Sequence, residues 1–142
     1  MPEVELIMRG YTYNTDQGGW GFSSVSLIRA KQNIVVDTGP HGRREYLLQM
    51  LKTRGLTPQD IGILILTHAH WDHCQNLDVF PNARIVIHSR EVEYARAPKD
   101  SDWATARYFK DMLRGRKIQH AKDGLEIEPG VKVIATPGHT KG

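Results

Sequence analysis

Hydrophobic residues alternate with polar ones in the first third of the chain and then gather into short continuous runs. Val4 to Tyr13 and Phe22 to Ala30 are rich in β-branched and aromatic residues and predict two strands, with a turn or loop at 14–19 between them. Asn33 to Val36 predicts a third strand. The run Ile61 to Leu66 is almost wholly apolar, which is typical of a strand buried on both faces. The pattern therefore predicts an antiparallel sheet edge that precedes a buried strand.

Two helical segments are expected in the first half of the chain. Arg43 to Arg54 places its apolar residues on one face, as an amphipathic helix does, and Gly55 is a natural C-terminal stop. A short helical turn should follow, with Thr57 as its N-cap and Pro58 at its first helical position.

Strands and helices are both expected in the second half. Ser89 is suited to cap a helix whose positive end lies near Glu91 and Glu93, and Trp103 to Leu113 predicts a further helix. Short apolar runs separated by turn residues predict strands at 84–88, 117–120, 125–127 and 131–135.

Composition narrows the class of protein. The 142 residues suffice for one domain with a real core, and 39% hydrophobic and 25% charged residues fit a soluble globular protein. The net charge of +3 gives little support for nucleic-acid binding, because basic and acidic residues are interspersed along the chain. Only one cysteine, Cys74, is present, which excludes an internal disulfide framework. With no leader-like or membrane-spanning run, we expect a cytoplasmic protein without a membrane partner.

The densest chemistry lies directly after the buried strand, in His68-Ala69-His70-Trp71-Asp72-His73. Residues two apart at a strand end point to the same side, so His68 and His70 can converge on one ion. Asp72 and His73 lie where the chain turns and can face a second position. Nitrogen and oxygen ligands favour zinc, with iron, manganese or cobalt as alternatives. The competing interpretation is a merely structural or solvated cluster.

This stretch resembles the His-x-His-x-Asp-His signature of the metallo-β-lactamase superfamily. Thr136-Pro137-Gly138-His139-Thr140 resembles the next motif of that superfamily, and Val35 to Gly39 resembles a shared upstream segment. The resemblance implies an α/β (α+β) fold, the four-layer αββα sandwich, of which residues 1–142 would form the N-terminal portion. It also implies that His139 joins His68 and His70 as a third ligand.

The same resemblance implies roles for the site residues. Three histidines would leave an open metal position, where a metal-bound hydroxide forms and attacks a carbonyl or another electrophile. Asp72 would bind a second zinc with His73 and act catalytically by orienting the nucleophile or moving its proton. Asp37 has two interpretations: a turn residue that caps nearby backbone donors, or a residue beneath the site that holds the ligand loop.

The chain departs from the family pattern after His139. Relatives continue through further strands and helices that supply a bridging aspartate and a last histidine, but no Asp or His follows His139 here. We therefore expect a domain truncated at its C-terminal side, whose complete form holds two zinc ions. Such a portion should expose an apolar sheet face, which a homo-oligomer or a complementing C-terminal piece would cover.

The substrate is less determined than the class of reaction. The segment 76–83 is most similar to lactonase branches of the superfamily, with thioester hydrolases of the glyoxalase II kind next, so a small-molecule lactone, ester or thioester is expected. A nuclease-type phosphodiesterase and a non-catalytic metal-binding half-domain remain alternatives, although nucleic acid is not the expected partner. His41, His88 and His120 are interpreted as structural, Cys74 as a small buried residue, and the basic cluster 114–117 as a solvated helix end.

Overall fold

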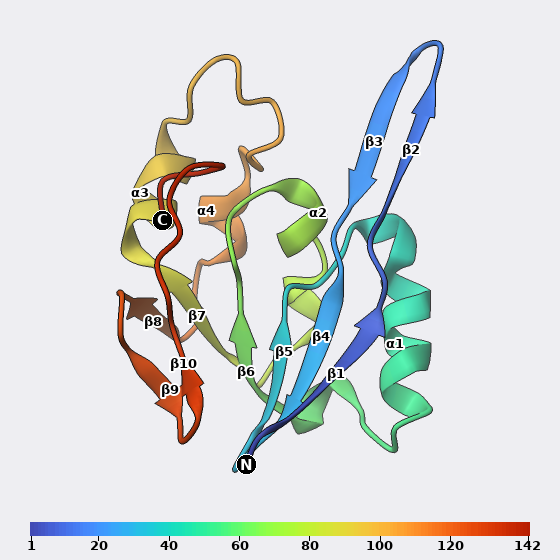
Figure 1. The fold of residues 1–142 in the computed structure, drawn as a ribbon, viewed down its shortest axis with the longest axis vertical. Helices are drawn as coiled ribbons and strands as arrows, with labels where there is room; N and C mark the ends of the chain where they lie inside the picture. The colour runs from blue at the N-terminus through green and yellow to red at the C-terminus, as the bar shows by residue number, and fades with distance from the viewer.

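The computed structural model describes residues 1–142 and contains a six-stranded mixed sheet (Figure 1). The order across the sheet is β1 (Glu3–Met8), β4 (Val25–Arg29), β5 (Asn33–Val36), β6 (Ile61–Ile65), β7 (Arg84–His88) and β8 (Ile118–Ala121). β1, β4 and β5 pair antiparallel, whereas β5, β6, β7 and β8 run parallel. The expected antiparallel edge and the buried strand that follows it are confirmed.

The first predicted strand is wrong as one element, because the chain leaves the sheet at Arg9 and Gly10. β1 ends at Met8, and β2 (Tyr11–Thr15) then pairs with β3 (Gly18–Phe22) in a separate hairpin that projects beyond the main sheet (Figure 1). Gly10 packs so closely that an added Cβ would lie 2.5 Å from the Phe22 carbonyl oxygen. A side chain there would clash with backbone, so this crossing point requires glycine.

The predicted 14–19 loop and the predicted 22–30 strand also need correction. Gly18 and Gly19 pair with Thr15 and Asn14, so only two residues remain as the hairpin turn. Phe22 belongs to the hairpin rather than to β4, and Ser23 and Ser24 separate the two strands. Cross-strand pairing has overridden the weak local preference of glycine for loops.

The first helix agrees with its prediction apart from its opening turn. A 3₁₀ turn, η1 (His41–Arg43), precedes α1 (Arg44–Lys52), and Gly55 follows with a φ of +69° that glycine adopts readily. The capping of η2 (Pro58–Asp60) by Thr57 is confirmed: the backbone N–H and hydroxyl of Thr57 both donate to Asp60 Oδ2, at 2.7 Å each.

In the second half, the helix expected after His88 is present but its predicted cap is wrong, and the helix expected over 103–113 is mostly absent. Ser89 is the first residue of α3 (Ser89–Arg96) rather than its cap, and His88 Nδ1 accepts the N–H of Arg90 at 3.2 Å. The expected helix over 103–113 is reduced to α4 (Phe109–Met112). The preceding residues instead bond to the histidine-rich loop, residues 66–70, and to the first residue of the helix after it. Ala106 N donates to Ala69 O, and Ala104 O accepts from Trp71 N. Tertiary hydrogen bonds have replaced those of a helix.

The main core lies between the sheet and its helices. Phe80 and Phe109 are the largest fully buried side chains, and α1, α3 and α4 all contribute to this one cluster. From the strands it takes Val25, Leu27, Val35, Ile61, Leu64, Ile85 and Ile87. Two shorter helical segments complete this side, α2 (Trp71–Cys74) and η3 (Leu77–Val79). No helix in the structure is long and apolar enough to cross a membrane.

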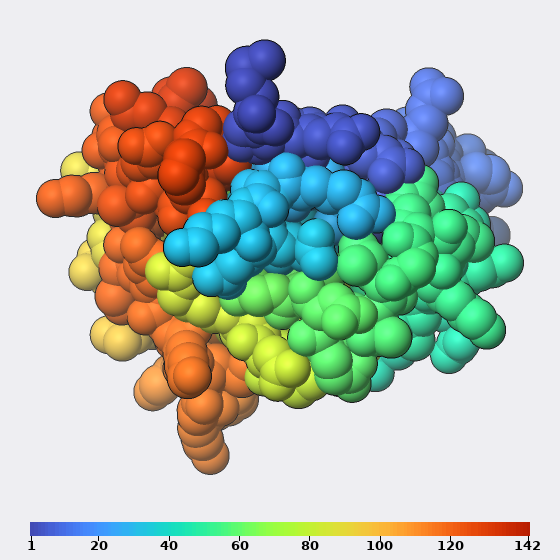
Figure 2. Space-filling model, turned by 90° about the horizontal axis from the view of Figure 1, so that it is seen from below, coloured from blue at the N-terminus to red at the C-terminus, as the bar shows by residue number.

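The opposite face of the sheet is better covered than expected. Ile34, Ile63 and Val86 are at most 1% exposed, because the hairpin of β9 (Glu126–Glu128) and β10 (Val131–Lys132) packs over them with Leu125, Ile127 and Val133. Figures 1 and 2 show this hairpin on the β7–β8 side, its tip beside the N-terminal segment. The strand predicted over 131–135 is shorter than expected, since β10 ends at Lys132.

Part of the expected exposed apolar face remains at the β1 edge. Val4 and Leu6 stand opposite Ile28 and Ser26 of β4, so they share the face that the β9–β10 hairpin covers elsewhere. They remain 67% and 53% exposed. The prediction of a wholly open face is wrong, since the hairpin shields the parallel half of the sheet.

Candidate metal centre

The histidine-rich loop leaves the carboxyl end of β6, where the parallel strands of the sheet end together. Leu66 still bonds to β7, with its N–H donating to Val86 O at 2.9 Å. Ala69 is fully buried between the two histidines that flank it. Because the chain stays extended through His70, with φ −67° and ψ 147°, His68 and His70 turn toward one side, with 4.5 Å between their ring centroids.

His139 reaches the same point from the other end of the chain. One ligand atom from each of His68, His70 and His139 lies within 4.8 Å of the others. The Nε2 atom of His139 is 3.1 Å from Nδ1 of His70, close to the roughly 3.3 Å expected between two nitrogens bound tetrahedrally at about 2.0–2.1 Å from zinc. The structure therefore brings together the three histidines that the motifs singled out.

These histidines fit a metal ion by their free atoms and their protonation. Nδ1 of His68 is 3.0 Å from the Thr67 hydroxyl, whereas its Nε2 is buried and has no hydrogen-bond partner. Burial, reinforced by the neighbouring histidines, lowers the pKa of His68 from 6.5 to about 3, and burial likewise lowers the pKa of His70. Both imidazoles are thus neutral near pH 7, as metal ligands must be.

His70 faces a carboxylate with its second nitrogen. Its Nε2 is 3.5 Å from Oδ1 of Asp102, a residue of the loop that bonds to Ala69 and Trp71. Tyr94 and Thr105 each donate a side-chain hydroxyl to Asp102 Oδ2 at 2.7 Å. Burial raises the pKa of Asp102, but these hydrogen bonds outweigh it and hold the pKa below its usual value. The charged carboxylate can orient the His70 ring.

Asp72 and His73 form a second donor group beside the first. Oδ2 of Asp72 is 3.6 Å from Nε2 of His73, and the His73 ring centroid is 4.0 Å from that of His68. Both residues lie in α2, which begins directly after His70. The sequence predicts that this pair faces a second position, and the structure places it next to the three histidines but outside their cluster.

Asp37 anchors both the loop and His73. Its Oδ2 lies 2.7 Å from Nδ1 of His73, and its Oδ1 accepts the backbone N–H of Thr67 at 2.8 Å. Asp37 has a φ of +59°, rare for any residue but glycine, asparagine and aspartate. Of its two interpretations, the structure favours the residue that holds the ligand loop, because its partners lie 30 and 36 positions away.

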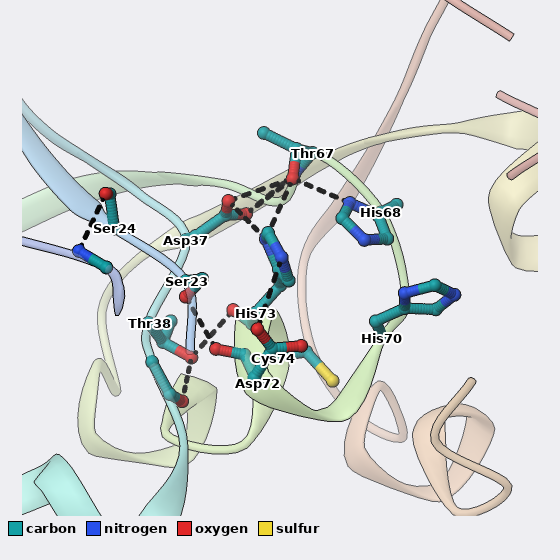
Figure 3. Close-up of polar contacts among 12 residues, drawn as sticks. Ser23, Ser24, Asp37, Thr38, Thr67, His68, His70, Asp72, His73 and Cys74 are labelled. Carbon is teal, nitrogen blue, oxygen red and sulfur yellow. Dashed lines mark hydrogen bonds and ion pairs between the residues drawn. The ribbon is translucent and has the colours of Figure 1, made fainter. Parts of the chain in front are cut away.

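Burial lowers the pKa of His73, but the hydrogen bond to Asp37 and the charges of Asp37 and Asp72 overcome this and raise it. The Thr67 hydroxyl lies at the centre of the group, in contact with Asp37, His68 and His73 (Figure 3). Thr67 was not singled out from the sequence, although its position directly before His68 was the available signal.

Hydrogen bonds from two earlier loops fix α2 in place. Ser23 donates its hydroxyl to Asp72 O at 2.6 Å, and Thr38 donates its hydroxyl to His73 O at 3.0 Å (Figure 3). The N–H of Thr38 donates to the same oxygen at 2.8 Å. Asn76 is fully buried, and its Nδ2 lies within 3.1 Å of the carbonyl oxygens of residues 38, 39 and 40. Asn76 is thus a structural residue here, one of the two roles considered for it.

Aromatic side chains of the hairpin stand beside the site. Trp71 packs edge-on against Trp20 and Phe22 of β3, with ring centroids 6.5 and 5.9 Å away. Trp20 remains 56% exposed, so this group forms an apolar wall that is open to solvent. The sequence predicts that Trp71 shapes one side of the site, and in the structure its ring packs against the β2–β3 hairpin.

The remaining candidates lie outside the cluster. His41 and His120 are exposed, and His88 caps α3. Cys74 is fully buried, and burial raises the pKa of its thiol to about 12, which fits a small packing residue. In the basic cluster, Arg116 is occupied structurally, since it donates to the carbonyl oxygens of Leu77 and Phe80.

Comparison with known protein sequences identifies one family and several relatives. The family model described as the Metallo-beta-lactamase superfamily matches residues 18–142. Metallo-beta-lactamase domain-containing protein 1 of Xenopus laevis is 34% identical over 140 residues, covering 96% of this chain and 53% of that protein. An N-acyl homoserine lactonase of Bacillus sp is 30% identical over 97 residues, covering 68% of this chain and 36% of the lactonase. The chain thus spans about half the length of the curated relatives it matches.

Solved structures agree on the fold. A Thermotoga maritima protein crystallised under the description of a metallo-beta-lactamase superposes with a TM-score of 0.81 and 21% identity. The match covers 99% of this chain and 69% of that one. At this identity the likeness concerns the fold alone.

Proposed function

The chain belongs to the metallo-beta-lactamase superfamily, and on that premise we propose that it is a metal-dependent hydrolase of small-molecule lactones, esters or thioesters. The observation that carries the proposal is the convergence of His68, His70 and His139 from two distant segments on one point. Two of these imidazoles are held neutral by burial, and His68 offers a buried nitrogen with no other partner. A chance cluster would not combine these properties.

Zinc is the proposed ion, because three imidazole nitrogens with an open fourth position are a familiar zinc environment. Iron, manganese and cobalt remain compatible with the same donors. Asp72 and His73 are proposed to hold a second ion in the complete protein. Within residues 1–142, these two side chains lie beside the three histidines.

A divalent cation, when bound, supplies a Lewis acid that polarises the substrate carbonyl and makes a water molecule acidic enough to act as a nucleophile near neutral pH. Asp72 is the proposed catalytic residue, since its carboxylate beside the three histidines can orient that water and accept its proton. Asp37 keeps His73 in one orientation, and Asp102 does the same for His70.

The substrate class rests on two observations. Lactonases are among the relatives, although they share only part of their length with this chain. The open aromatic wall of Trp20, Phe22 and Trp71 suits the apolar part of an acyl compound. The likeness to lactonases favours a small acylated substrate, and the aromatic wall offers an apolar contact surface for its acyl chain.

The test is metal content and intact mass, followed by turnover. Elemental analysis and native mass spectrometry on wild type and His70→Ala should show zinc that the variant loses. An acyl homoserine lactone, a p-nitrophenyl ester and a glutathione thioester are then assayed, with chelator and with zinc added back. Zinc-dependent hydrolysis of one of them is expected, and wild-type protein that binds no metal would refute the proposal.

A second candidate is a metal-binding unit that turns over substrate only when another chain packs against it. Val4 and Leu6 are exposed on an apolar sheet face, and a cavity of about 210 Å³ with mostly apolar walls lies on the same side of the sheet, beside 131–136. Zinc binding without hydrolysis, together with concentration-dependent association in light scattering, would favour this candidate. A monomer with turnover would exclude it.

A further inference from the structure

Glu91, the third residue of α3, is a buried carboxylate without a cationic partner. Its side chain is fully inaccessible, and no lysine, arginine or histidine forms an ion pair with it. A buried charge of this kind is costly unless hydrogen bonds compensate for it. Its place near the positive end of a helix explains neither the burial of the Glu91 side chain nor the way in which that side chain points.

Backbone N–H groups from both ligand segments compensate the charge. Oε1 accepts from the N–H groups of Lys141 and Gly142 at 2.9 and 2.6 Å, and Oε2 lies 3.3 Å from the N–H of Ala69. Ala69 lies between His68 and His70, whereas Lys141 follows His139 by two positions. One carboxylate therefore bridges the two segments that carry the three histidines.

The His139 segment has few other attachments. Within residues 136–142, the bonds to the rest of the chain are those to Glu91 and the contact of His139 with His70. The remaining hydrogen bond, from Gly138 N to Thr140 O, is internal. His139 itself is exposed, so packing does little to hold it.

Close packing at Gly142 supports the same contact. A Cβ added there would lie 2.7 Å from Cγ of Glu91 and 3.0 Å from Cβ of His88. The backbone can approach the carboxylate this closely because residue 142 has no side chain.

We propose that Glu91 is a positioning residue that sets the third histidine: by bonding to Ala69, Lys141 and Gly142, it holds His139 at the fixed pair His68 and His70. This rests on the proposed metal site. Without Glu91, the 136–142 segment becomes ordered only when the ion binds. The conformational entropy that the segment then loses makes the free energy of zinc binding less favourable. Residues that orient ligands from behind typically change metal affinity about 10–100-fold.

The test compares zinc affinity, from competition with a chromophoric chelator, in a graded set of variants. Glu91→Ala should weaken zinc binding about 10–100-fold. Glu91→Gln should lie between it and wild type, because an amide keeps one acceptor but turns a donor toward the other N–H groups. Gly142→Ala, which crowds the carboxylate, should also weaken binding. Glu93→Gln, on the exposed side of the same helix, should not.

A double-mutant cycle separates positioning from general destabilisation. In a His139→Ala background, Glu91→Ala should cost no further zinc affinity, since the residue it positions is already absent. A full additional loss in that background would overturn the proposal. The cobalt-substituted protein should also lose intensity in its visible absorption in Glu91→Ala, as in His139→Ala.

A measurement on metal-free protein tests the role of Glu91 separately from the proposed metal site. In metal-free protein, amide exchange followed by NMR should be slow at Lys141 and Gly142 and faster in Glu91→Ala. Unchanged exchange would refute the role of Glu91 whatever the zinc result. Slow wild-type exchange with no zinc binding would instead refute the metal site and leave the tether standing.

Discussion

Nδ1 of His73 lies 2.7 Å from Oδ2 of Asp37, which joins the helix after the histidine-rich loop to the end of β5. Asp37 also accepts from Thr67 just before His68, so one carboxylate holds both ends of the ligand stretch. The relationship explains how the stretch from His68 to His73, with its four potential metal ligands, keeps one conformation.

Replacing Asp37 should therefore loosen the loop. We expect Asp37→Ala to lower the free energy of unfolding of the metal-free protein by about 1–3 kcal/mol, because the Thr67 N–H and His73 lose a buried acceptor. Urea unfolding measures this. Asp78→Ala is the matched control: Asp78 is 57% exposed in its ion pair with Arg44 and should cost about 0–1 kcal/mol. Equal losses in the two variants would contradict the anchoring role.

Acid should destabilise the metal-free protein through His68. The unfolded chain binds a proton at His68 near its ordinary pKa of 6.5, whereas the folded protein does so only near pH 3. Between these values the unfolded state holds more protons, so stability falls as pH falls. His70 acts in the same direction, and His73, whose pKa is raised, acts in the opposite one.

Urea unfolding of metal-free wild type and His68→Gln between pH 4 and pH 7 checks this expectation, and the slope of stability against pH should be shallower in the variant. An unchanged slope would mean that His68 titrates normally in the folded protein.

Cys74 should not react in the native state. Burial holds the pKa of its thiol at about 12, so both thiolate and access are lacking at pH 8. We expect labelling by a disulfide reagent to be slow in buffer and complete in denaturant, with Cys74→Ala as the blank. Rapid stoichiometric labelling of native protein would show that this part of α2 opens.

Asn76→Ala should be among the more destabilising polar substitutions. The buried amide lies within 3.1 Å of three consecutive carbonyl oxygens and also accepts from Arg44. Leaving these groups unpaired should cost about 2–4 kcal/mol in urea unfolding. Asn82→Ala, which removes one exposed bond to Gln59 O, is the control and should stay within about 0.5 kcal/mol.

Trp20→Ala tests the aromatic wall within the proposed function. Trp20 contacts Trp71 and is more than half exposed, so its loss should leave zinc content unchanged. We expect KM to rise for substrates with long apolar acyl chains and to change little for short ones. Tyr13→Ala, on the neighbouring strand of the hairpin, serves as the comparison. A loss of bound metal in Trp20→Ala would show that the wall supports the site itself.

The sequence by itself determined the features that depend on local spacing. His68 and His70 point together because they are two residues apart in extended chain, and Asp72 and His73 follow because α2 begins at once. The helix that ends before Gly55 and the Thr57 cap were predictable for the same reason: each depends on residues within a few positions of one another.

Only the tertiary structure decided what surrounds those residues. Asp102 lies in a segment that the sequence assigned no role, and the bonds of 104–106 to the histidine loop replaced part of an expected helix. Glu91 had the local features of a helix start, yet its carboxylate bonds to Lys141, which lies 50 residues away. The β9–β10 hairpin also covered the parallel half of a sheet face that was expected to be open. Hydrogen bonds and packing between distant segments leave no periodic trace in the sequence, so the folded chain alone shows which groups hold the histidines in place.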